Sequence, residues 1–259
     1  MPREPDTPLV ISDWPEIVRR IWARTPARLL VGRAGAAYRT DTQLDLREAH
    51  AAARDAVRGE LDLQAAFGAV FVAQWGLSQV GTQAGPKDEY LLRPDLGRRF
   101  DDASRTELLR RCSAGNDLQI AIGDGLSVPA VAAQVPPLLP LLHGGAKARG
   151  WSVGQTFVIR HCRVGILNEI GELLSPQVAV LLIGERPGLA TAESLSAYMA
   201  YRPRRMHSDA NRNLISNIHA RGVSPQHAAV RILNLAAQMM KAGASGCHLR
   251  EEFPALEQK

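Results

Sequence analysis

The sequence predicts an α/β protein with a mostly parallel, Rossmann-like sheet that is flanked by helices and preceded by a smaller, mainly helical domain. Two observations support this prediction. From residue 117 onward, short apolar runs alternate with helical patterns, which is the order typical of parallel sheets. Before about residue 115, apolar residues recur mainly at helical spacing. We therefore divide the 259 residues into an N-terminal extension with a short amphipathic helix, a mainly helical domain and an α/β domain, at residues 1–38, 39–115 and 116–259.

The first expected helices lie in the extension and in the helical domain. Residues 10–23 are expected to form a short amphipathic helix, because their apolar side chains recur at helical spacing. A second helix is expected to start at Thr42, whose hydroxyl can cap it, and to run to about residue 59. Its apolar stripe needs a packing partner, which the apolar segment 63–80 can supply. A further helix is expected over residues 105–111.

Four strands are expected in the α/β domain, at residues 118–122, 157–159, 178–183 and 195–201. The third is an apolar, β-branched-rich run that stops abruptly at Gly184, as a buried strand that ends in a loop does. Helices are expected between the first three strands, one starting at Ser127 and one ending before Pro176. The last helix is expected to be capped by Ser224 and to end near Gly243.

The composition argues against several classes of protein. Apolar residues make up 46% and charged residues 22%, which is the balance of a globular protein, and no apolar run is long enough to cross a membrane. The start of the sequence lacks the pattern of a secretion signal, so we expect a cytoplasmic protein. The net charge of +5 comes mainly from scattered arginines, most of which solvated helix faces explain, and nucleic-acid binding is not expected.

The sequence holds no local motif for catalysis or metal binding. Its three cysteines are widely spaced, as expected of reduced thiols, and no histidine has a partner at metal-ligand spacing. The GDG turn at residues 123–125 could offer backbone amides to ligand oxygens, but Val128 breaks the dinucleotide-binding fingerprint. A P-loop and a nucleophile elbow are also lacking. We therefore assign no catalytic and no metal-binding residue to this chain.

Glu185 and Arg186 directly follow the expected strand 178–183, at the place where ligands bind in open α/β sheets. A carboxylate fixed at this place can accept hydrogen bonds from the amides of a ligand. An internal pair between Glu185 and Arg186 is an equally good explanation. Asn217 and His219 leave the same choice between ligand binding and a structural role.

Six segments of the chain together resemble one known family. The longest, at residues 163–189, reads RVGILNEIGELLSPQVAVLLIGERPGL. The others read QLDLREAHAAARDAV, LRPDLGRRF, IAIGDGLS, SLSAYMAYRPRR and NLISNIH. In combination they closely resemble the small (light) subunit of ethanolamine ammonia-lyase, over most of the chain. Residues 63–87 match least, because they are more apolar than is typical of that family.

The resemblance implies an adenosylcobalamin-dependent enzyme that converts ethanolamine to acetaldehyde and ammonia. A separate, barrel-shaped large subunit would hold the substrate and the radical chemistry, and this chain would be its non-catalytic partner. The corrinoid would lie between the two subunits, and the positions that match the contacts of the family are Val164, Glu185 and Leu214. Because relatives can carry Cys at the position of Leu214, a main-chain contact is expected there.

The resemblance also implies a hetero-oligomer of paired large and small subunits and, in many bacteria, enclosure in a protein-shelled microcompartment. The amphipathic start at residues 10–22 is a candidate docking helix for the shell, and packing on its own subunit explains it equally well. An alternative function is that of a stand-alone α/β protein that binds a nucleotide or another small ligand at the same strand ends. A DNA-binding protein is a third possibility, which the scattered arginines do not favour.

Overall fold

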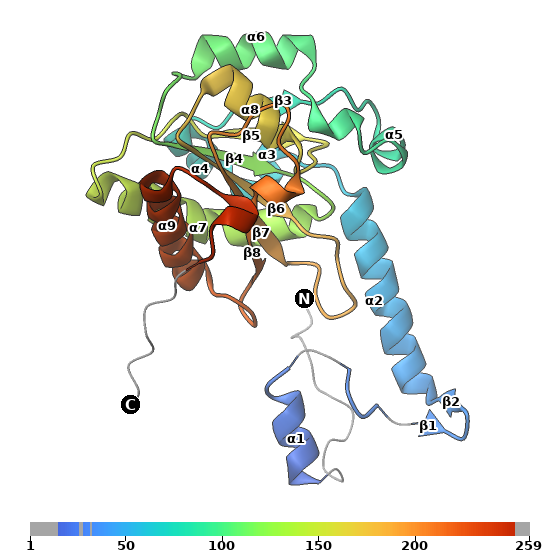
Figure 1. Ribbon diagram of the computed structural model, residues 1–259. Helices are drawn as coiled ribbons and strands as arrows, with labels where there is room; N and C mark the ends of the chain where they lie inside the picture. Colours follow the sequence, from blue (N-terminus) through green and yellow to red (C-terminus); the bar gives the residue numbers. More distant parts are fainter. Residues whose placement is uncertain (1–14, 26–27, 32, 252–259) are drawn as a thin grey trace, which may run out of the picture.

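The computed structural model shows a body built on one large sheet with helices on both faces, from which an arm projects (Figure 1). The structure describes residues 15–25, 28–31 and 33–251. Residues 10–14 of the expected first helix lie outside the described residues, and the described part of that helix is α1 (Glu16–Trp22).

The sheet has six strands in the order β3-β5-β4-β6-β7-β8. Their bounds are β3 (Gln79–Gly81), β4 (Leu118–Gly123), β5 (Phe157–Arg160), β6 (Val178–Gly184), β7 (Leu195–Tyr201) and β8 (Asn213–Ile218). Pairing is parallel from β3 through β5 and β4 to β6, and antiparallel between β6 and β7 and between β7 and β8. The four strands expected from the sequence are confirmed as β4, β5, β6 and β7, whereas β3 and β8 were not expected.

The change of strand direction follows from the connections. Helix α7 (Val128–Ala148) returns the chain from β4 to the start of β5, and α8 (Ile166–Leu174) returns it from β5 to the start of β6. Parallel neighbours need such crossover connections. Beyond β6 the connections hold no α-helix among the described residues, so the chain reverses direction at each turn.

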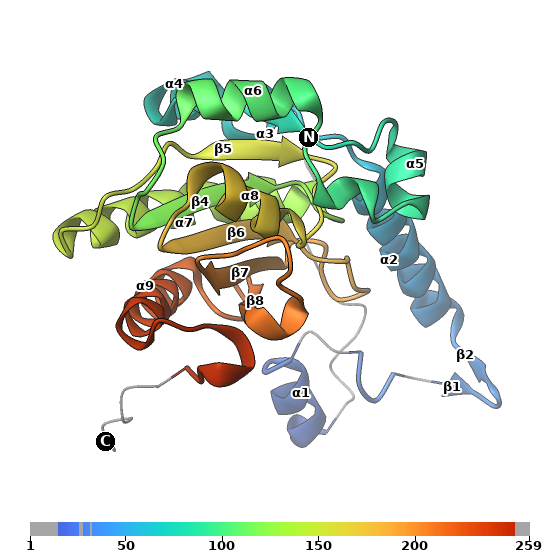
Figure 2. The same ribbon diagram turned by 45° about the horizontal axis from the view of Figure 1, so that its top comes forward.

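Helices cover both faces of the sheet (Figure 2), and a separate apolar cluster lies on each face. Helices α7 and α9 (Pro225–Ala242) cover one face together with α3 (Leu63–Phe67), and α4 (Ala69–Trp75) lies beside α3. Helices α8 and α6 (Asp102–Arg111) cover the other face. The segment 63–80 therefore packs in the main core through Phe67 and Leu77, and the expectation that it covers the apolar stripe of the helix before it is wrong.

The starts of two helices confirm the expected caps. The Ser127 hydroxyl accepts a hydrogen bond from the backbone N–H of Ala130, and the Ser224 hydroxyl accepts one from His227, each at 3.3 Å. The expected cap at Thr42 is wrong, because α2 (Thr40–Arg58) begins two residues earlier, after Arg39, with no side-chain cap. The Asp41 carboxylate instead accepts a hydrogen bond from the N–H of Thr42 at 2.7 Å.

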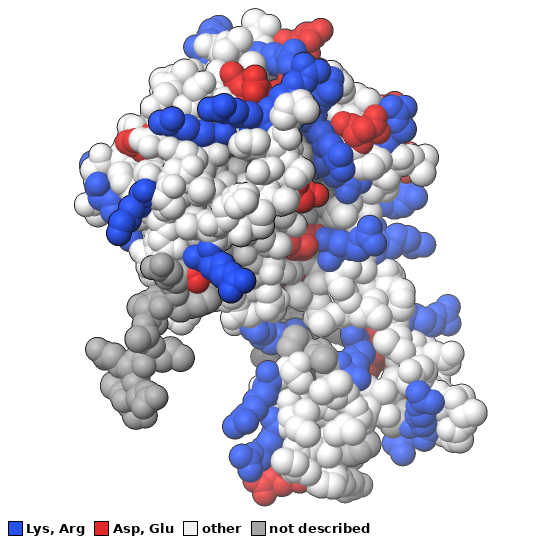
Figure 3. Space-filling model, viewed as in Figure 1, with Lys and Arg blue, Asp and Glu red and all other residues white. Residues whose placement is uncertain are grey.

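Helix α2 forms the arm of the molecule, with a small hairpin of β1 (Arg33–Ala34) and β2 (Ala37–Tyr38) at its far end (Figure 1). Ala56, near the body, is the one buried residue of the helix. Residues 15–58 hold nine arginines and five acidic residues, and Figure 3 shows basic side chains along this region. Within the described residues, no helix is both long and apolar enough to span a membrane.

Candidate functional site

A cavity of about 1060 Å³, which we call the α8 cavity, lies at the start of α8. Its walls come from α8, from the first part of α6, from β7, from the 3-10 helix η1 (Leu96–Arg98) and from the loop 205–212 that precedes β8. Because α8 follows β5 directly, the cavity lies near the carboxyl end of a parallel strand, where open α/β sheets bind ligands.

The α8 cavity is rich in arginine. Its lining includes Arg98, Arg99, Arg105, Arg163, Arg205 and Arg212. The lining also includes three carboxylates, and each of these already has a donor inside the protein. Glu169 accepts hydrogen bonds from Arg105 and from the N–H of Phe100, Asp209 pairs with Arg212, and Glu172 accepts from the N–H of Arg205. The cavity therefore keeps an excess of positive charge.

Arg212 is deeply held, since its side chain is only 6% exposed. Its Nη1 pairs with Asp209 and its Nη2 donates to Asn168 Oδ1 at 2.9 Å. Burial lowers the pKa of Arg212, but a guanidinium keeps its proton in a protein at neutral pH. The positive charge is thus fixed in place before any ligand arrives.

Three buried polar atoms of the cavity residues have no hydrogen-bond partner within the described part of the chain. They are Arg163 Nε, Arg212 Nε and His207 Nδ1. Buried polar atoms are nearly always satisfied in native proteins, because an unsatisfied one costs about 1–3 kcal/mol. Three such atoms around one cavity indicate that a polar group from outside the chain completes it.

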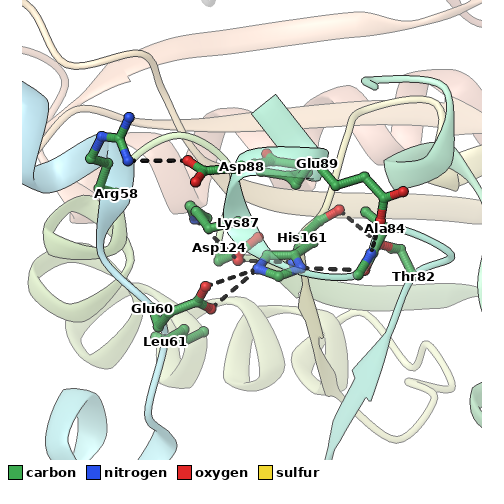
Figure 4. Close-up of polar contacts among 12 residues, drawn as sticks. Arg58, Glu60, Leu61, Thr82, Ala84, Lys87, Asp88, Glu89, Asp124 and His161 are labelled. Atoms are coloured by element: carbon green, nitrogen blue, oxygen red, sulfur yellow. Dashed lines mark hydrogen bonds and ion pairs between the residues drawn. The ribbon is translucent and has the colours of Figure 1, made fainter. Parts of the chain in front are cut away.

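A buried polar cluster fixes the turn that leads into the cavity. Asp124 accepts hydrogen bonds from the N–H groups of His161 and Cys162, at 2.9 and 2.8 Å, and Lys87 Nζ lies 3.8 Å from the same carboxylate (Figure 4). His161 has a φ of 57° and a ring nitrogen 3.1 Å from Glu60, at the base of α2. These contacts hold the backbone just before Arg163 and Val164 in one conformation.

Tyr90 of α5 (Lys87–Leu92) contacts the same turn. Its hydroxyl lies 2.8 Å from the carbonyl oxygen of Cys162, and its ring lies 4.3 Å from the Arg163 guanidinium carbon. Arg163 Nη2 also donates to the carbonyl oxygen of Tyr90 at 3.2 Å. A cation held over an aromatic face in this way is oriented as well as stabilised.

Two amides at the GDG turn are already used inside the protein, which leaves fewer of them for a ligand than the sequence suggests. The N–H of Asp124 donates to the carbonyl oxygen of Ile159, and the N–H of Leu126 donates to that of Gly184. A Cβ atom at Gly125 would lie 2.3 Å from the Gly184 oxygen, so the end of β6 fills the space beside the turn. The role of this sequence is to allow two backbone segments to approach closely.

The three residues expected from the resemblance lie around Tyr198 of β7. Val164 and Tyr198 both line the α8 cavity. Leu214, which is 44% exposed, is opposite Tyr198 in the antiparallel β7–β8 register, so the two side chains share a face of the sheet. Burial raises the pKa of Tyr198, and the nearby charge of Glu185 raises it further. Val164, Glu185 and Leu214 thus come together, although Glu185 and Leu214 do not line the cavity itself.

Comparison with known proteins identifies the family. The family model described as Ethanolamine ammonia-lyase light chain (EutC) matches residues 15–250. The ethanolamine ammonia-lyase small subunit of Clostridium perfringens is 42% identical over 228 residues, which cover 88% of this chain and 75% of that protein. Those of Clostridioides difficile and Listeria innocua are 40% and 41% identical, over 88% and 87% of this chain and 76% and 75% of the relatives. The chain belongs to the ethanolamine ammonia-lyase small-subunit family.

Glu185 is held by a hydroxyl group and not by its neighbour Arg186. The Ser196 hydroxyl donates to Glu185 Oε1, and the N–H of Glu185 donates to the carbonyl oxygen of Ser194 at 3.1 Å. No ion pair joins Glu185 to Arg186 within the described residues. The second carboxylate oxygen of Glu185 is therefore left to accept a hydrogen bond from outside.

Asn217 and His219 have a structural role in this family member. His219 Nε2 lies 2.7 Å from Asn217 Oδ1, and the N–H of Arg221 donates to His219 Nδ1 at 3.2 Å. Nδ1 is thus the acceptor and Nε2 the donor, which describes a neutral imidazole with both nitrogens satisfied. Burial lowers the pKa of His219, in agreement with this state. Among the described residues, no cluster of three or more His, Cys, Asp or Glu side chains is arranged to hold a metal ion.

Sequence reasoning did not single out the cavity residues Arg212, Arg163, His207 and Tyr198. A signal for Tyr198 was present in the sequence. Tyr198 lies two residues after Ser196 on an expected strand, and alternate residues of a strand share one face. The arginines gave no such signal, because they are far apart in the sequence and only the folded chain brings them together.

Proposed function

We propose that this chain is the small subunit of an adenosylcobalamin-dependent ethanolamine ammonia-lyase and that it holds one side of the corrinoid at the interface with a large subunit. The reaction would be the conversion of ethanolamine to acetaldehyde and ammonia. The observation that carries this proposal is the convergence of Val164, Glu185 and Leu214 around Tyr198, beside the α8 cavity. Family membership supports it independently.

The residues present fit such a cofactor. A corrinoid has an apolar macrocycle with amide groups at its rim, so it needs apolar walls and hydrogen-bond acceptors. Val164 offers an apolar side chain, Leu214 offers main-chain groups with an apolar side chain beside them, and Glu185 offers a carboxylate oxygen to an amide N–H. Adenosylcobalamin supplies radical chemistry when it is bound, and in this proposal the substrate meets that chemistry on the large subunit. The residues of this chain bind and orient the cofactor and exclude water from one side of it.

The proposed partner is the large subunit, in a hetero-oligomer of paired large and small subunits. Leu214 is a large apolar side chain on an edge strand and is nearly half exposed, as expected of a position that a partner or a large cofactor covers. An interface that encloses a cofactor buries apolar surface on both chains, so the complex is expected to be permanent.

The deciding experiment is co-expression of this chain with a large subunit, followed by an ethanolamine deamination assay with and without adenosylcobalamin. The complex is expected to release ammonia only when the cofactor is present, and this chain alone is expected to be inactive. A complex that is purified intact and still shows no cofactor-dependent deamination would overturn the proposal.

Enclosure in a protein-shelled microcompartment is a separate part of the proposal. The amphipathic pattern at the start of the chain supports it, since Ile17 in α1 is 60% exposed. Val18 in the same helix is buried, which also fits packing on its own subunit. Deletion of residues 1–22 is expected to abolish co-localisation with shell proteins in cells, and unchanged co-localisation would remove this part of the proposal.

A stand-alone protein that binds a nucleotide is the second candidate function, and the arginine-rich lining of the α8 cavity is the observation that favours it. Calorimetric titration of the purified chain with nucleoside phosphates separates the two candidates. Tight nucleotide binding without any corrinoid binding in the co-expressed complex would favour the second one.

A further inference from the structure

We propose that His161 carries a hydrogen on both ring nitrogens and, as an imidazolium, holds the base of the arm against the body of the molecule until the extra proton is lost. The contact that carries the proposal is the pair between His161 and Glu60, which we call the latch (Figure 4). Glu60 is the second residue after the end of α2, and we call residues 56–61 the arm base. Both partners of the latch belong to this chain, so it does not depend on the proposed function.

Both ring nitrogens of His161 lie against hydrogen-bond acceptors. Nε2 lies 3.1 and 3.2 Å from the two carboxylate oxygens of Glu60, and Nδ1 lies 3.4 Å from the carbonyl oxygen of Ala84. The Glu60 side chain is 51% exposed, and a carboxylate in contact with solvent is ionised at neutral pH and can only accept. A neutral imidazole has a single N–H and would leave one of the two contacts without a hydrogen. The imidazolium supplies a donor to each acceptor.

His219 shows the opposite arrangement in the same chain. Its Nδ1 accepts a hydrogen bond from the N–H of Arg221, and its Nε2 faces an acceptor, Asn217 Oδ1. One hydrogen on the ring satisfies both contacts, so a neutral imidazole suffices. Both histidines are buried, and the contrast therefore comes from their partners and not from their exposure.

The carboxylates around the His161 ring favour its protonation. Among the described residues, His161 is the one basic side chain within ion-pair distance of Glu60. Asp124 is a second carboxylate and accepts from the backbone N–H of His161 at 2.9 Å. Burial raises the pKa of Asp124, whereas Lys87 and two N–H donors favour its ionised form. Lys87 opposes protonation of the ring, but it is itself paired with Asp124.

Burial alone would disfavour the charged ring, since the His161 side chain is only 3% exposed. Tyr90 offsets part of this cost, because its ring stacks on the imidazole with the centroids 5.2 Å apart. Burial raises the pKa values of Tyr90 and of the Cys162 thiol, so both stay neutral. The other charged groups on the elements packed here have partners within the chain: Arg58 with Asp88, Glu89 with the N–H of Gly85, and Arg163 with the carbonyl oxygen of Tyr90.

The latch joins the arm to a firmly held turn of the body. The N–H of His161 donates to Asp124, and the Thr82 hydroxyl donates to the carbonyl oxygen of His161 at 3.0 Å. On the other side of the latch, α2 is exposed along almost its whole length. Loss of the proton removes one charge-assisted hydrogen bond and leaves Glu60 without a countercharge. The stabilisation of the arm base is therefore present while the ring is protonated and is lost as the pH rises.

The protonation state is tested by ¹⁵N NMR of the histidine rings in the full-length chain. At pH 7 the His161 ring should show the two similar nitrogen shifts of an imidazolium, and the His219 ring should show the two separated shifts of a neutral tautomer. His161→Gln assigns the His161 signals by their loss, and Glu60→Gln assigns them by their displacement if His161→Gln does not fold. A neutral tautomer at His161 at pH 7 would overturn the proposal.

The latch is tested by amide deuterium exchange of the arm base between pH 6 and pH 9, with each rate divided by the intrinsic exchange rate. Protection of the arm base in the wild type should fall about 10–100-fold as the pH rises, the range for one charge-assisted hydrogen bond. Glu60→Gln should show the lower protection throughout, because its amide does not favour a protonated ring. Arg58→Met removes the exposed pair with Asp88 at the same junction and should keep the pH response of the wild type.

The latch is supported if the His161 ring is an imidazolium and the pH response is lost in Glu60→Gln. The proposal is overturned if Glu60→Gln is as well protected as the wild type at pH 7, or if the two respond equally to pH. Unchanged protection of the wild-type arm base across the pH range would overturn it as well. These measurements contain neither a corrinoid nor a large subunit, so a failure of the proposed function is detected separately, by the deamination assay.

Discussion

Asn168 Oδ1 accepts a hydrogen bond from Arg212 Nη2 at 2.9 Å, and this contact joins α8 to the last residue before β8. The amide nitrogen of Asn168 donates to the carbonyl oxygens of His207 and Arg205, at 2.7 and 3.3 Å. One side chain thus connects the helix to three points of the loop that forms a wall of the α8 cavity. Asn168 is therefore a positioning residue for Arg212 and for the loop.

Replacing Asn168 by Leu should loosen this loop. We expect a loss of about 1–3 kcal/mol in the free energy of unfolding, because the carbonyl groups and the buried arginine lose their partner. Denaturant unfolding measures the loss, and protease cleavage within residues 203–212 measures the mobility. Asn168→Asp keeps an acceptor for Arg212 and loses both donors. Its stability and its cleavage rate should lie between those of the wild type and Asn168→Leu. Wild-type stability and cleavage in Asn168→Leu would show that the loop is held by other contacts.

Glu185 is expected to act on cofactor affinity more than on catalysis. Glu185→Ala in the complex should weaken retention of adenosylcobalamin by about 10-fold, since one hydrogen bond to a charged acceptor is lost, with little change in turnover at saturating cofactor. Glu185→Gln, which keeps an acceptor for the Ser196 hydroxyl, should retain more of the affinity. Gel filtration followed by absorbance measures retention, and equal retention in Glu185→Ala would contradict this role.

Gly125 and Gly144 should respond to alanine in opposite ways. Gly125 has a φ of 57° and its Cβ would lie 2.3 Å from the Gly184 oxygen, so Gly125→Ala should cost about 2–4 kcal/mol of folding free energy. Gly144 lies inside α7 with nothing within 4 Å of its Cβ position, so Gly144→Ala should stabilise by about 0.5–1 kcal/mol. Thermal or denaturant unfolding compares them, and similar stabilities would show that the close approach of the two loops is not required.

Asp124 and Lys87 should be strongly coupled, because both are removed from solvent. Asp124 is fully buried and Lys87 is 10% exposed, with 3.8 Å between its Nζ and the carboxylate. Asp124→Asn should destabilise the chain by about 3–5 kcal/mol, because it leaves an ammonium group buried without a countercharge. The double variant with Lys87→Met should lose less than the sum of the two single losses. A strictly additive result in denaturant unfolding would show that the pair does not interact.

Stability should fall between about pH 7.5 and about pH 5.5. Burial lowers the pKa values of His143, His207 and His219 in the folded chain. The unfolded chain, with histidine pKa values of about 6.5, therefore binds protons first as the pH falls. This stabilisation is complete above the unfolded value and is lost as the pH falls towards the folded values. Denaturant unfolding at several pH values measures the slope, which His143→Gln should reduce; a flat profile would contradict the prediction.

The sequence predicts the inner strands well and the outer ones poorly, for a physical reason. Strands β4 and β6 are buried along their whole length and read as apolar runs, interrupted only by Gln119 in β4. Strand β8 is an edge strand that contains Asn213, Ser216 and Asn217, and β3 has only three residues. Their place in the sheet depends on pairing with distant strands and not on local composition.

The residues of the site also divide into those that the sequence predicts and those that it does not. Val164, Glu185 and Leu214 were expected because they stand within segments that resemble a family. The arginines of the α8 cavity come from η1, α6, the start of α8 and the loop before β8, and in the sequence they are indistinguishable from solvated surface residues. Only the packing of these four elements brings the charges together. The start of α2 at Thr40 was missed because no capping side chain marks it: the residue before the helix is Arg39, which makes no cap.

The arm has a consequence for how the chain unfolds. Helix α2 is exposed along almost its whole length, so most of its backbone hydrogen bonds are protected by the helix alone. In proteins most helical stability comes from tertiary packing, which α2 largely lacks, so it can open without disturbing the sheet. Amide deuterium exchange should therefore show two regimes in one molecule, fast in residues 40–55 and slow in β4 and β6. The chain can lose about a fifth of its helical signal while its core remains intact, because α2 holds 19 of the 102 described α-helical residues.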